Sequence, residues 1–190
     1  IMAYYNEKCG PDAVDESYDY FYTNKNRTHT IRGIGKVTSS HADNDPTHYE
    51  EFRINDGITE LCDRCLNSIS ISSIELPSTL IKIGSSCFKE TRISRIILPN
   101  SLVEIGHNNF PRTLESINIP PSLIQFPMDN LHECWSLSSI YVDSGNESYK
   151  VIDGVLYNHD VTEALLCPRT KSRQIVVPNT VKHIAEICFM

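Results

Sequence analysis

The sequence predicts a right-handed β-rich solenoid with a parallel sheet and short helical turns. Three observations support this prediction: a unit of about 22 residues recurs, apolar residues hold the same places in each unit, and one further place holds only Cys or Asn. The units align on an anchor position that is occupied by Pro77, Pro99, Pro120 and Pro178. Asn55 stands 22 residues before Pro77 and fits the same register.

Five places in each unit are apolar, at three and one residues before the anchor and at three, six and eleven residues after it. The pair before the anchor has a period of two, which indicates a short strand with one inward face. The anchor proline ends that strand because it has no N–H to donate to a ladder. In this order, the places hold Phe52, Ile74, Ile96, Ile117 and Ile175; Ile54, Leu76, Leu98, Ile119 and Val177; Ile58, Leu80, Leu102, Leu123 and Val181; Leu61, Ile83, Ile105, Phe126 and Ile184; and Leu66, Phe88, Phe110, Leu131 and Phe189.

Two more places indicate tight bends. The place seven residues after the anchor is small or turn-forming, and the place ten residues after it can turn a polar or thiol side chain towards a neighbouring backbone group. A single unit cannot bury its apolar face alone, whereas stacked units can, and stacking produces a solenoid. These two places hold Cys62, Gly84, Gly106, Pro127 and Ala185, and Cys65, Cys87, Asn109, Asn130 and Cys188.

The clearest unit runs from the strand at 74–76 through Pro77, Leu80 and Ile83-Gly84 to Cys87-Phe88, and the units ending in Phe110 and Phe189 repeat it. This pattern resembles the BspA-like family of leucine-rich repeats. Residues 30–37 look like the N-terminal strand of that family, and residues 149–157 with 165–168 look like its hairpin insertion. The resemblance covers residues 28–190 and implies the leucine-rich repeat fold.

Four segments follow from this reading. Residues 1–50 form an N-terminal β cap and loop, 51–142 hold leucine-rich repeats of about 22 residues, 143–168 form the hairpin insertion, and 169–190 form a further, truncated repeat. Within the cap, residues 18–22 and 28–32 flank a turn at 24–26 and predict a hairpin. Asp153-Gly154 predicts the turn of the insertion. Because the last unit stops mid-way, we expect the protein to continue beyond it or this end to pair with something.

Composition excludes several classes of protein. Lys and Arg number 17 against 24 Asp and Glu, for a net charge of −7, so no nucleic-acid partner is expected. No apolar run approaches the ~20 residues of a membrane span, so we expect no membrane insertion by this chain. The N-terminus shows no signal peptide, although a cleaved signal or an anchor could lie outside the chain. Seven cysteines are an odd number and too few for a disulfide scaffold. Their number therefore does not tell whether the protein lies in a reducing or an oxidising compartment.

Candidate catalytic and metal-binding groups are weak. Cys62 and Cys65 form a lone CxxC that we interpret as buried structural thiols, although Cys65 and Cys87 would stack within disulfide range of one another. Residues 41–48 mix His and Asp without the spacing of a known metal loop, and we interpret them as a solvated loop. No catalytic motif is present. We therefore expect no enzyme activity, no cofactor and no metal, and a hydrolase would require the 41–48 loop to bind a metal and line a cleft.

The outward face of the strand column is the candidate binding surface. Strand alternation places the residue two before each anchor on the solvent side, and these residues include the exposed apolar Ile97, Tyr141 and Val176. Such residues also occur singly on the surfaces of proteins that bind nothing there. The pattern is therefore equally compatible with a binding surface and with ordinary solvent-exposed residues. The predicted surface comprises Arg53, Glu75, Arg95, Ile97, Asn118, Tyr141 and Val176.

The sequence supports two functions. The resemblance implies a surface-displayed or secreted protein that adheres noncovalently to host proteins or cells, and its acidic balance would favour basic partner patches. Free cysteines without a visible signal favour instead a cytoplasmic repeat scaffold that binds a protein partner. Two glycosylation sequons, at Asn26 and Asn146, slightly favour the secretory route.

Overall fold

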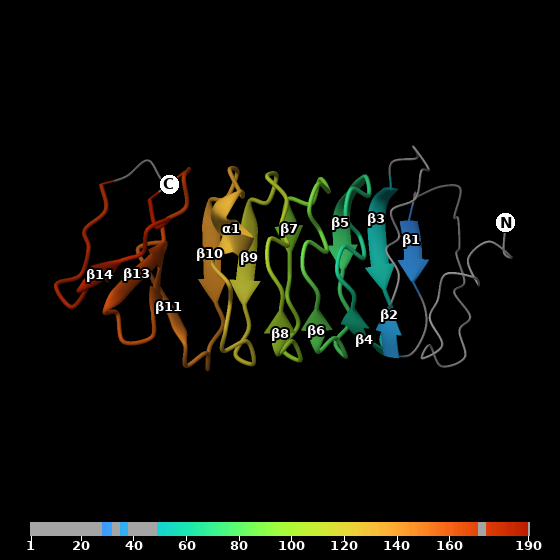
Figure 1. Ribbon diagram of the computed structural model, residues 1–190, viewed down its shortest axis with the longest axis horizontal. Coiled ribbons are helices and arrows are strands. Elements are labelled where there is room, and N and C mark those ends of the chain that lie inside the picture. The colour runs from blue at the N-terminus through green and yellow to red at the C-terminus, as the bar shows by residue number, and fades with distance from the viewer. Residues whose placement is uncertain (1–27, 32–34, 38–48, 171–173, 190) are drawn as a thin grey trace, which may run out of the picture.

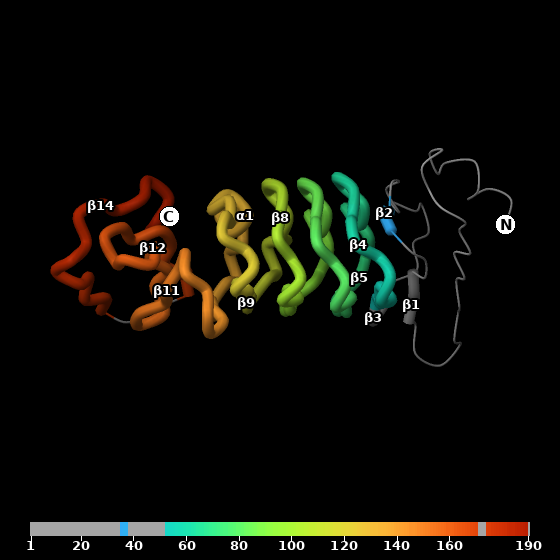
Figure 2. Tube along the Cα trace, turned by 90° about the horizontal axis from the view of Figure 1, so that it is seen from below, coloured from blue at the N-terminus to red at the C-terminus, as the bar shows by residue number. Residues whose placement is uncertain are grey.

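The protein is a solenoid whose coils stack along one long axis (Figures 1 and 2). The computed structural model describes residues 28–31, 35–37, 49–170 and 174–189. Each of the first four coils contributes a first strand and, after the anchor turn, a second strand that runs the opposite way in Figure 1, while the next two coils contribute a first strand only. The first strands are β1 (Thr28–Ile31), β3 (Tyr49–Ile54), β5 (Ile71–Glu75), β7 (Arg95–Ile96), β9 (Ser116–Ile119) and β10 (Ser139–Val142), and the second strands are β2 (Gly35–Val37), β4 (Ile58–Leu61), β6 (Lys82–Ile83) and β8 (Glu104–Ile105).

All pairings between these strands are parallel and follow the repeat register. The second strands form one sheet in the order β2-β4-β6-β8. The first strands form two sheets, β1-β3-β5 and β7-β9-β10, so the ladder of backbone hydrogen bonds is interrupted between β5 and β7. Ile74 pairs with Phe52, and Ile117 pairs with both Ile96 and Ile140. The predicted β-rich solenoid with parallel sheets and little helix is confirmed.

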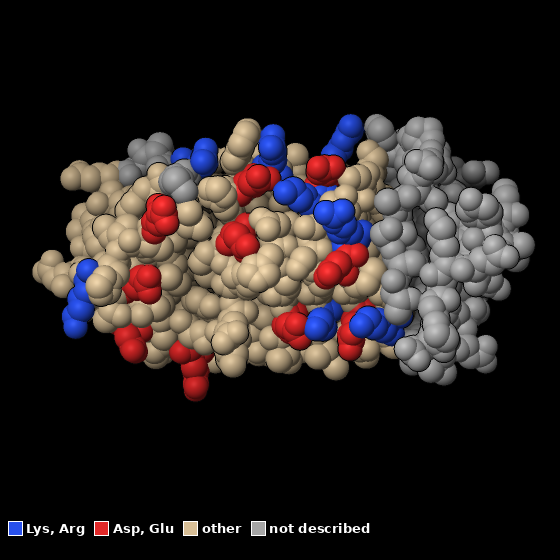
Figure 3. Space-filling view, in the orientation of Figure 1, with Lys and Arg blue, Asp and Glu red and all other residues tan. Residues whose placement is uncertain are grey.

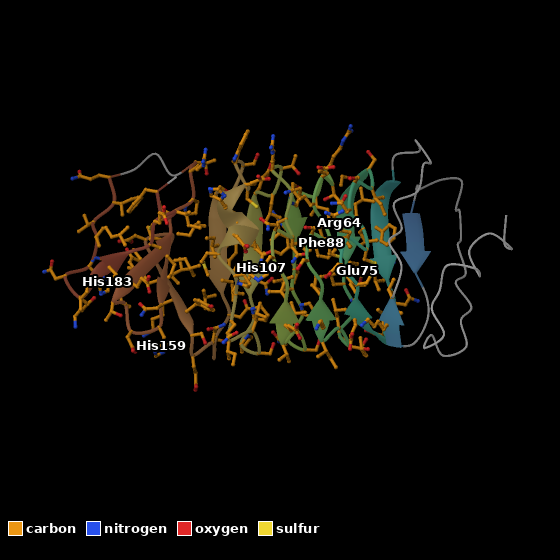
Figure 4. The ribbon with its side chains drawn as sticks, in the orientation of Figure 1. Arg64, Glu75, Phe88, His107, His159 and His183 are labelled. Carbon is orange, nitrogen blue, oxygen red and sulfur yellow. The ribbon has the colours of Figure 1, made fainter. Side chains whose placement is uncertain are left out.

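The predicted apolar columns form the core between the two rows of strands. Phe52, Ile96, Ile117, Leu80 and Leu102 are at most 2 % exposed. Three phenylalanines at successive inward places make an aromatic ladder, in which the ring centroids of Phe88 and Phe110 lie 6.1 Å apart and those of Phe110 and Phe126 lie 6.4 Å apart. Side chains fill the space between the strand rows, where Phe88 is labelled in Figure 4.

The turn after the anchor is the same in the described units from β3 onward. The backbone N–H three residues after the anchor donates to the anchor carbonyl, as from Leu80 to Pro77 at 3.2 Å and from Leu102 to Pro99 at 3.0 Å. A hydroxyl two residues after the anchor then joins neighbouring coils. The hydroxyl of Thr79 donates to the carbonyl of Ile58 at 2.8 Å, and equivalent bonds come from Ser101 and Ser122. This hydroxyl ladder was not predicted.

The place that holds only Cys or Asn connects successive coils. The side-chain oxygen of Asn109 accepts from the backbone N–H of Cys87, and that of Asn130 accepts from the N–H of Asn109, both at 2.7 Å. Asn130 also donates to the carbonyl of Gly106 at 2.8 Å. It lies in the helix α1 (Asp129–His132) and is buried. The expectation that this side chain satisfies a neighbouring backbone group is confirmed at Asn109 and Asn130.

The insertion is a hairpin that connects the repeat array to the last unit. Strands β11 (Tyr149–Ile152) and β12 (Val155–Asn158) are antiparallel, and the predicted turn at Asp153-Gly154 joins them with both residues at positive φ. Strand β13 (Glu163–Leu166) returns antiparallel to β12 and then pairs in parallel with β14 (His183–Ile184). Strand β13 therefore takes the place of a second strand in the stack.

The two ends of the array bear differently on the expectations from the sequence. Ile184 and Phe189 occupy places that are inward elsewhere, yet they are 55 % and 52 % exposed, which agrees with the apolar surface expected on an incomplete last unit. At the other end, the first partner strand of the predicted hairpin, residues 18–22, and the 41–48 loop both lie outside the described residues. Strand β1 pairs in parallel with β3, in the manner of the later first strands. The four segment boundaries stay a prediction.

Candidate protein-binding surface

The first strands bring most of the predicted surface residues into one column. Strand register places Glu75 beside Arg53 and Tyr141 beside Asn118, while Arg95 lies in a neighbouring column beside Ser116. Ile97 and Tyr141 are 70 % and 59 % exposed. Tyr141 points outward from β10 and Ile97 from the position just after β7, and the residues on either side of Ile97 are buried in the core, so the column is held in place.

The polar members of the column differ in how far they are already engaged. Arg53 forms an ion pair with Glu75 at 3.2 Å. Asn118 is half-buried, and its side-chain oxygen accepts from the N–H of Leu98 at 2.7 Å. Its amide donates to the carbonyl of Leu98 and to the carboxylate of Asp143, at 3.0 and 2.8 Å. Asn118 therefore links neighbouring coils, and its amide group has its hydrogen-bond donors and acceptor occupied within the protein.

Val176 lies apart from the rest of the predicted surface. It is 72 % exposed, as the strand alternation predicted. However, it follows the hairpin insertion in sequence, lies in no strand, and has no register partner in the column that ends at Tyr141 in β10. The structure thus brings Arg53, Glu75, Arg95, Ile97 and Asn118 towards Tyr141, but it does not bring Val176 into that set.

A groove of about 560 Å³ opens on this face between β5 and β7. It coincides with the interruption in the sheet, where adjacent first strands share no ladder. Glu75, Arg95 and Ile97 line it, together with Pro99 and the half-buried Leu76. Glu75 is labelled in Figure 4. A carboxylate, a guanidinium and an exposed aliphatic side chain therefore face one hollow, which is a suitable arrangement for a protein segment.

The second strands present a different surface, where opposite charges alternate. Register places Glu60 beside Lys36 and Lys82, and Glu104 beside Lys82. Ion pairs join Lys36 to Glu60 at 3.2 Å and Lys82 to Glu104 at 2.7 Å, and this alternation of blue and red follows the lower edge in Figure 3. The hydrogen bond that Lys82 donates to Glu104 raises the pKa of Lys82. The positive and negative side chains of this column therefore neutralise one another. The column was not predicted, although the alternating signs recur at a fixed offset in the sequence.

Beside that charged column stands an exposed apolar one that was also missed. Ile81, Val103 and Ile124 each follow the anchor by four residues and are 48 %, 54 % and 63 % exposed. The N–H of Ile81 donates to the carbonyl of Thr59, and that of Val103 donates to the carbonyl of Ile81, at 2.8 and 2.9 Å. Their common offset could have revealed them from the sequence.

The cysteines pack as structural thiols. Cys65 and Cys87 are fully buried, Cys62 is half-buried, and the six described cysteines are free. A hydrogen bond from Cys65 lowers the pKa of the Cys62 thiol. Hydrogen bonds with Cys62 and Cys87, together with burial, raise the pKa of Cys65 well above its ordinary value. No group of three or more His, Cys, Asp or Glu side chains that could hold a metal ion occurs in the described part of the chain.

The two sequons have different positions. Asn26 lies outside the described residues. Asn146 is buried at 9 % exposure, and its amide donates to the carbonyl of Pro120 at 2.8 Å. Its oxygen accepts from the N–H groups of Ser148 and Tyr149, both at 2.9 Å. A glycan on Asn146 would have to be attached before folding and would displace the bond to Pro120.

The recurring strands, the anchor turn and the Cys/Asn joint together define the repeat. A model of the BspA-type leucine-rich repeat region matches residues 43–159 with six copies. The chain belongs to the BspA-type leucine-rich repeat family. A comparison with curated protein sequences gave no match.

Two solved structures share the solenoid fold of this chain. One is a leucine-rich repeat protein from Eubacterium ventriosum, with 24 % identity, a TM-score of 0.66 and coverage of 83 % of this chain and 51 % of the other. The second is the pneumococcal vaccine antigen PcpA, with 20 % identity, a TM-score of 0.63 and coverage of 90 % and 54 %. The chain spans about half the length of each. Among the described residues, no helix is long and apolar enough to cross a bilayer.

Proposed function

We propose that this BspA-type domain is a non-enzymatic protein-binding module that uses the outward face of its first strands. The observation that supports this proposal is the groove between β5 and β7, where Glu75, Arg95 and Ile97 converge on a rigid face that continues to Tyr141. Arg and Tyr are favoured at the energetic centres of protein interfaces. An exposed isoleucine beside them supplies apolar area that a partner can bury.

The partner is proposed to be a host protein or a host cell-surface protein, bound noncovalently without a cofactor. The array is regular and presents an open groove on an extended strand face, which suits recognition of a protein surface. The net charge of −7 favours partners with basic patches. A basic patch of such a partner would compete with Arg53 for the carboxylate of Glu75, which lines the groove.

The protein is further proposed to be displayed on the cell surface or secreted. Membership of the BspA-type family supports it, as does the description of one structural neighbour as a vaccine antigen. The free cysteines do not contradict an extracellular location. Five of the six described cysteines are buried, and burial protects a thiol from oxidants.

An intracellular scaffold is the alternative function, and the absence of disulfides among the described cysteines favours it. Antibody labelling of intact source cells distinguishes the two. Under the display proposal, nonpermeabilised cells are labelled, and brief protease treatment removes the label. Labelling that requires permeabilisation and survives protease would contradict display and support the scaffold. A cytosolic protein labelled in the same cells is the control for leakage.

A further inference from the structure

Trp135, the single tryptophan of the chain, is half exposed and has two arginines close to its ring. The guanidinium carbon of Arg112 is 4.4 Å from the centroid of the indole ring, and that of Arg169 is 5.9 Å away. Both distances are within the range of cation–π attraction. The three residues come from separate segments, since Arg112 precedes β9, Trp135 follows α1 and Arg169 follows β13.

The backbone holds these segments together. The N–H of Ser136, next to Trp135, donates to the carbonyl of Arg112 at 3.1 Å. The hydroxyl of Thr170, next to Arg169, donates to the carbonyl of Leu137 at 2.9 Å. The cluster is therefore ordered before any ligand arrives, which reduces the entropy that binding would cost.

The positive charge of the cluster is not neutralised within the described part of the chain. No carboxylate there lies within ion-pair distance of Arg112 or Arg169, and Glu133, the nearest acidic residue in sequence to Trp135, pairs with Lys89 at 3.6 Å. A guanidinium that stacks on an indole keeps its N–H edges free for hydrogen bonds in its own plane. The protein has a net charge of −7, so these two arginines around one aromatic ring make a positively charged site on a protein that is negative as a whole.

We infer that Arg112, Trp135 and Arg169 form a second binding site, which takes an acidic peptide segment. An Asp or Glu carboxylate would accept two hydrogen bonds from a guanidinium, and the aliphatic part of the segment would cover the exposed indole. Arg112 and Trp135 lie in the turns that precede β9 and β10, and Arg169 follows β13. None of them belongs to the strand face described above, so the site is independent of the proposed function.

The chemistry beside the cluster favours a peptide over an acidic sugar. The adjoining hollow, of about 10 Å³, is too small for either a sugar ring or a peptide side chain, so a ligand must lie on the exposed indole itself. Its lining includes His132, Pro168 and Arg169, and none of its lining residues is a carboxylate or a carboxamide. Sugar hydroxyl groups need such acceptors for directed hydrogen bonds, whereas a peptide carboxylate needs only the donors that are present.

The fluorescence of Trp135 tests the inference directly, because no other tryptophan contributes. The full chain is titrated with hexaglutamate, and the Arg112→Gln/Arg169→Gln double variant is titrated in parallel. We expect a saturable change that weakens as salt rises and whose apparent Kd increases at least about tenfold in the double variant. The matched control is Arg92→Gln, which removes an exposed arginine elsewhere and should bind as the unchanged chain does.

Three results would overturn the inference, provided that circular dichroism shows each variant folded. They are the absence of a saturable change, equal binding by the double variant, and tighter binding of a sialylated trisaccharide than of hexaglutamate. Failure of the strand-face proposal would leave this result unchanged. A variant with Arg95, Ile97 and Tyr141 all replaced by Ala is expected to bind hexaglutamate normally.

Discussion

The side-chain oxygen of Asn109 accepts a hydrogen bond from the backbone N–H of Cys87, one coil earlier, at 2.7 Å and fully out of water. Asn130 repeats this bond to Asn109, so the bends of three successive coils are joined through side-chain amides. A buried N–H without a partner costs about 1–3 kcal/mol, which makes this joint a strong requirement at each bend.

Asn130→Ala is therefore predicted to lower the free energy of unfolding by about 2–3 kcal/mol, because it removes the acceptor for Asn109 and the donor to Gly106. Asn109→Ala should cost less. Its oxygen is bonded, but its buried amide nitrogen has no partner, so the replacement also removes an unsatisfied donor. Urea unfolding of both variants measures this. A larger loss for Asn109→Ala than for Asn130→Ala would contradict the ranking.

Phe110→Ala is predicted to destabilise the array by about 3–5 kcal/mol, since the ring is buried and stacks on Phe88 and Phe126 on its two sides. Phe189→Ala is the matched control. It occupies the equivalent place in the last unit but is half exposed, so we expect it to change the unfolding free energy by less than about 1 kcal/mol. Equal losses for the two variants would show that the phenylalanine ladder has no special role.

The repeat was predictable because apolar side chains recur at fixed spacings along the sequence. Ile74, Ile96 and Ile117 are buried as their period required, and Asp153-Gly154 forms the expected hairpin turn. Features that depend on contacts between distant segments were not predictable. The stack of Arg112 and Arg169 on Trp135 depends on how the insertion returns to the array, which no spacing reveals.

The candidate surface was partly predictable for the same reason. Alternation along the strands correctly placed Ile97 and Tyr141 in solvent. Alternation says nothing about side-chain partners, so the occupied hydrogen bonds of Asn118 were missed. The groove could not be predicted either, because it depends on the loss of pairing between β5 and β7, and the repeat pattern gives every unit the same strand.

Asn146→Ala is predicted to lower the unfolding free energy by about 2 kcal/mol, because three hydrogen bonds tie Asn146 to Pro120, Ser148 and Tyr149 at the start of the insertion. Ser144→Ala, an exposed change two residues away, is the control and should change little. Urea unfolding measures both. If Asn146→Ala is as stable as Ser144→Ala, these bonds do not hold the insertion to the array.

Alkaline pH should destabilise the fold. Burial raises the pKa of Cys134 to about 12 from an ordinary 9.0. A raised pKa means that the folded form holds its proton where the unfolded form has lost it, so stability is full below about pH 9 and falls as pH rises from there towards 12. Cys188 follows the same sign, with burial raising its pKa to about 11.

The unfolding free energy of the Cys134→Ala variant should therefore fall less between pH 8 and 10 than that of the unchanged chain, by about 1 kcal/mol. Ser136→Ala, which changes an exposed side chain nearby, should keep the original dependence. Urea unfolding at the two pH values measures the difference. Identical slopes for Cys134→Ala and the unchanged chain would contradict a protonated, buried Cys134.

The most direct test of the proposed function measures binding of the full chain to cultured epithelial cells by flow cytometry. The strand-face variant carries Arg95→Ala, Ile97→Ala and Tyr141→Ala, and its matched control carries Arg92→Ala, Val103→Ala and Ile124→Ala, which remove similar exposed groups elsewhere. We predict saturable binding by the unchanged chain and by the control, with at least about a tenfold loss of affinity in the strand-face variant. Undiminished binding by a folded strand-face variant would contradict the assignment of this face as the protein-binding surface.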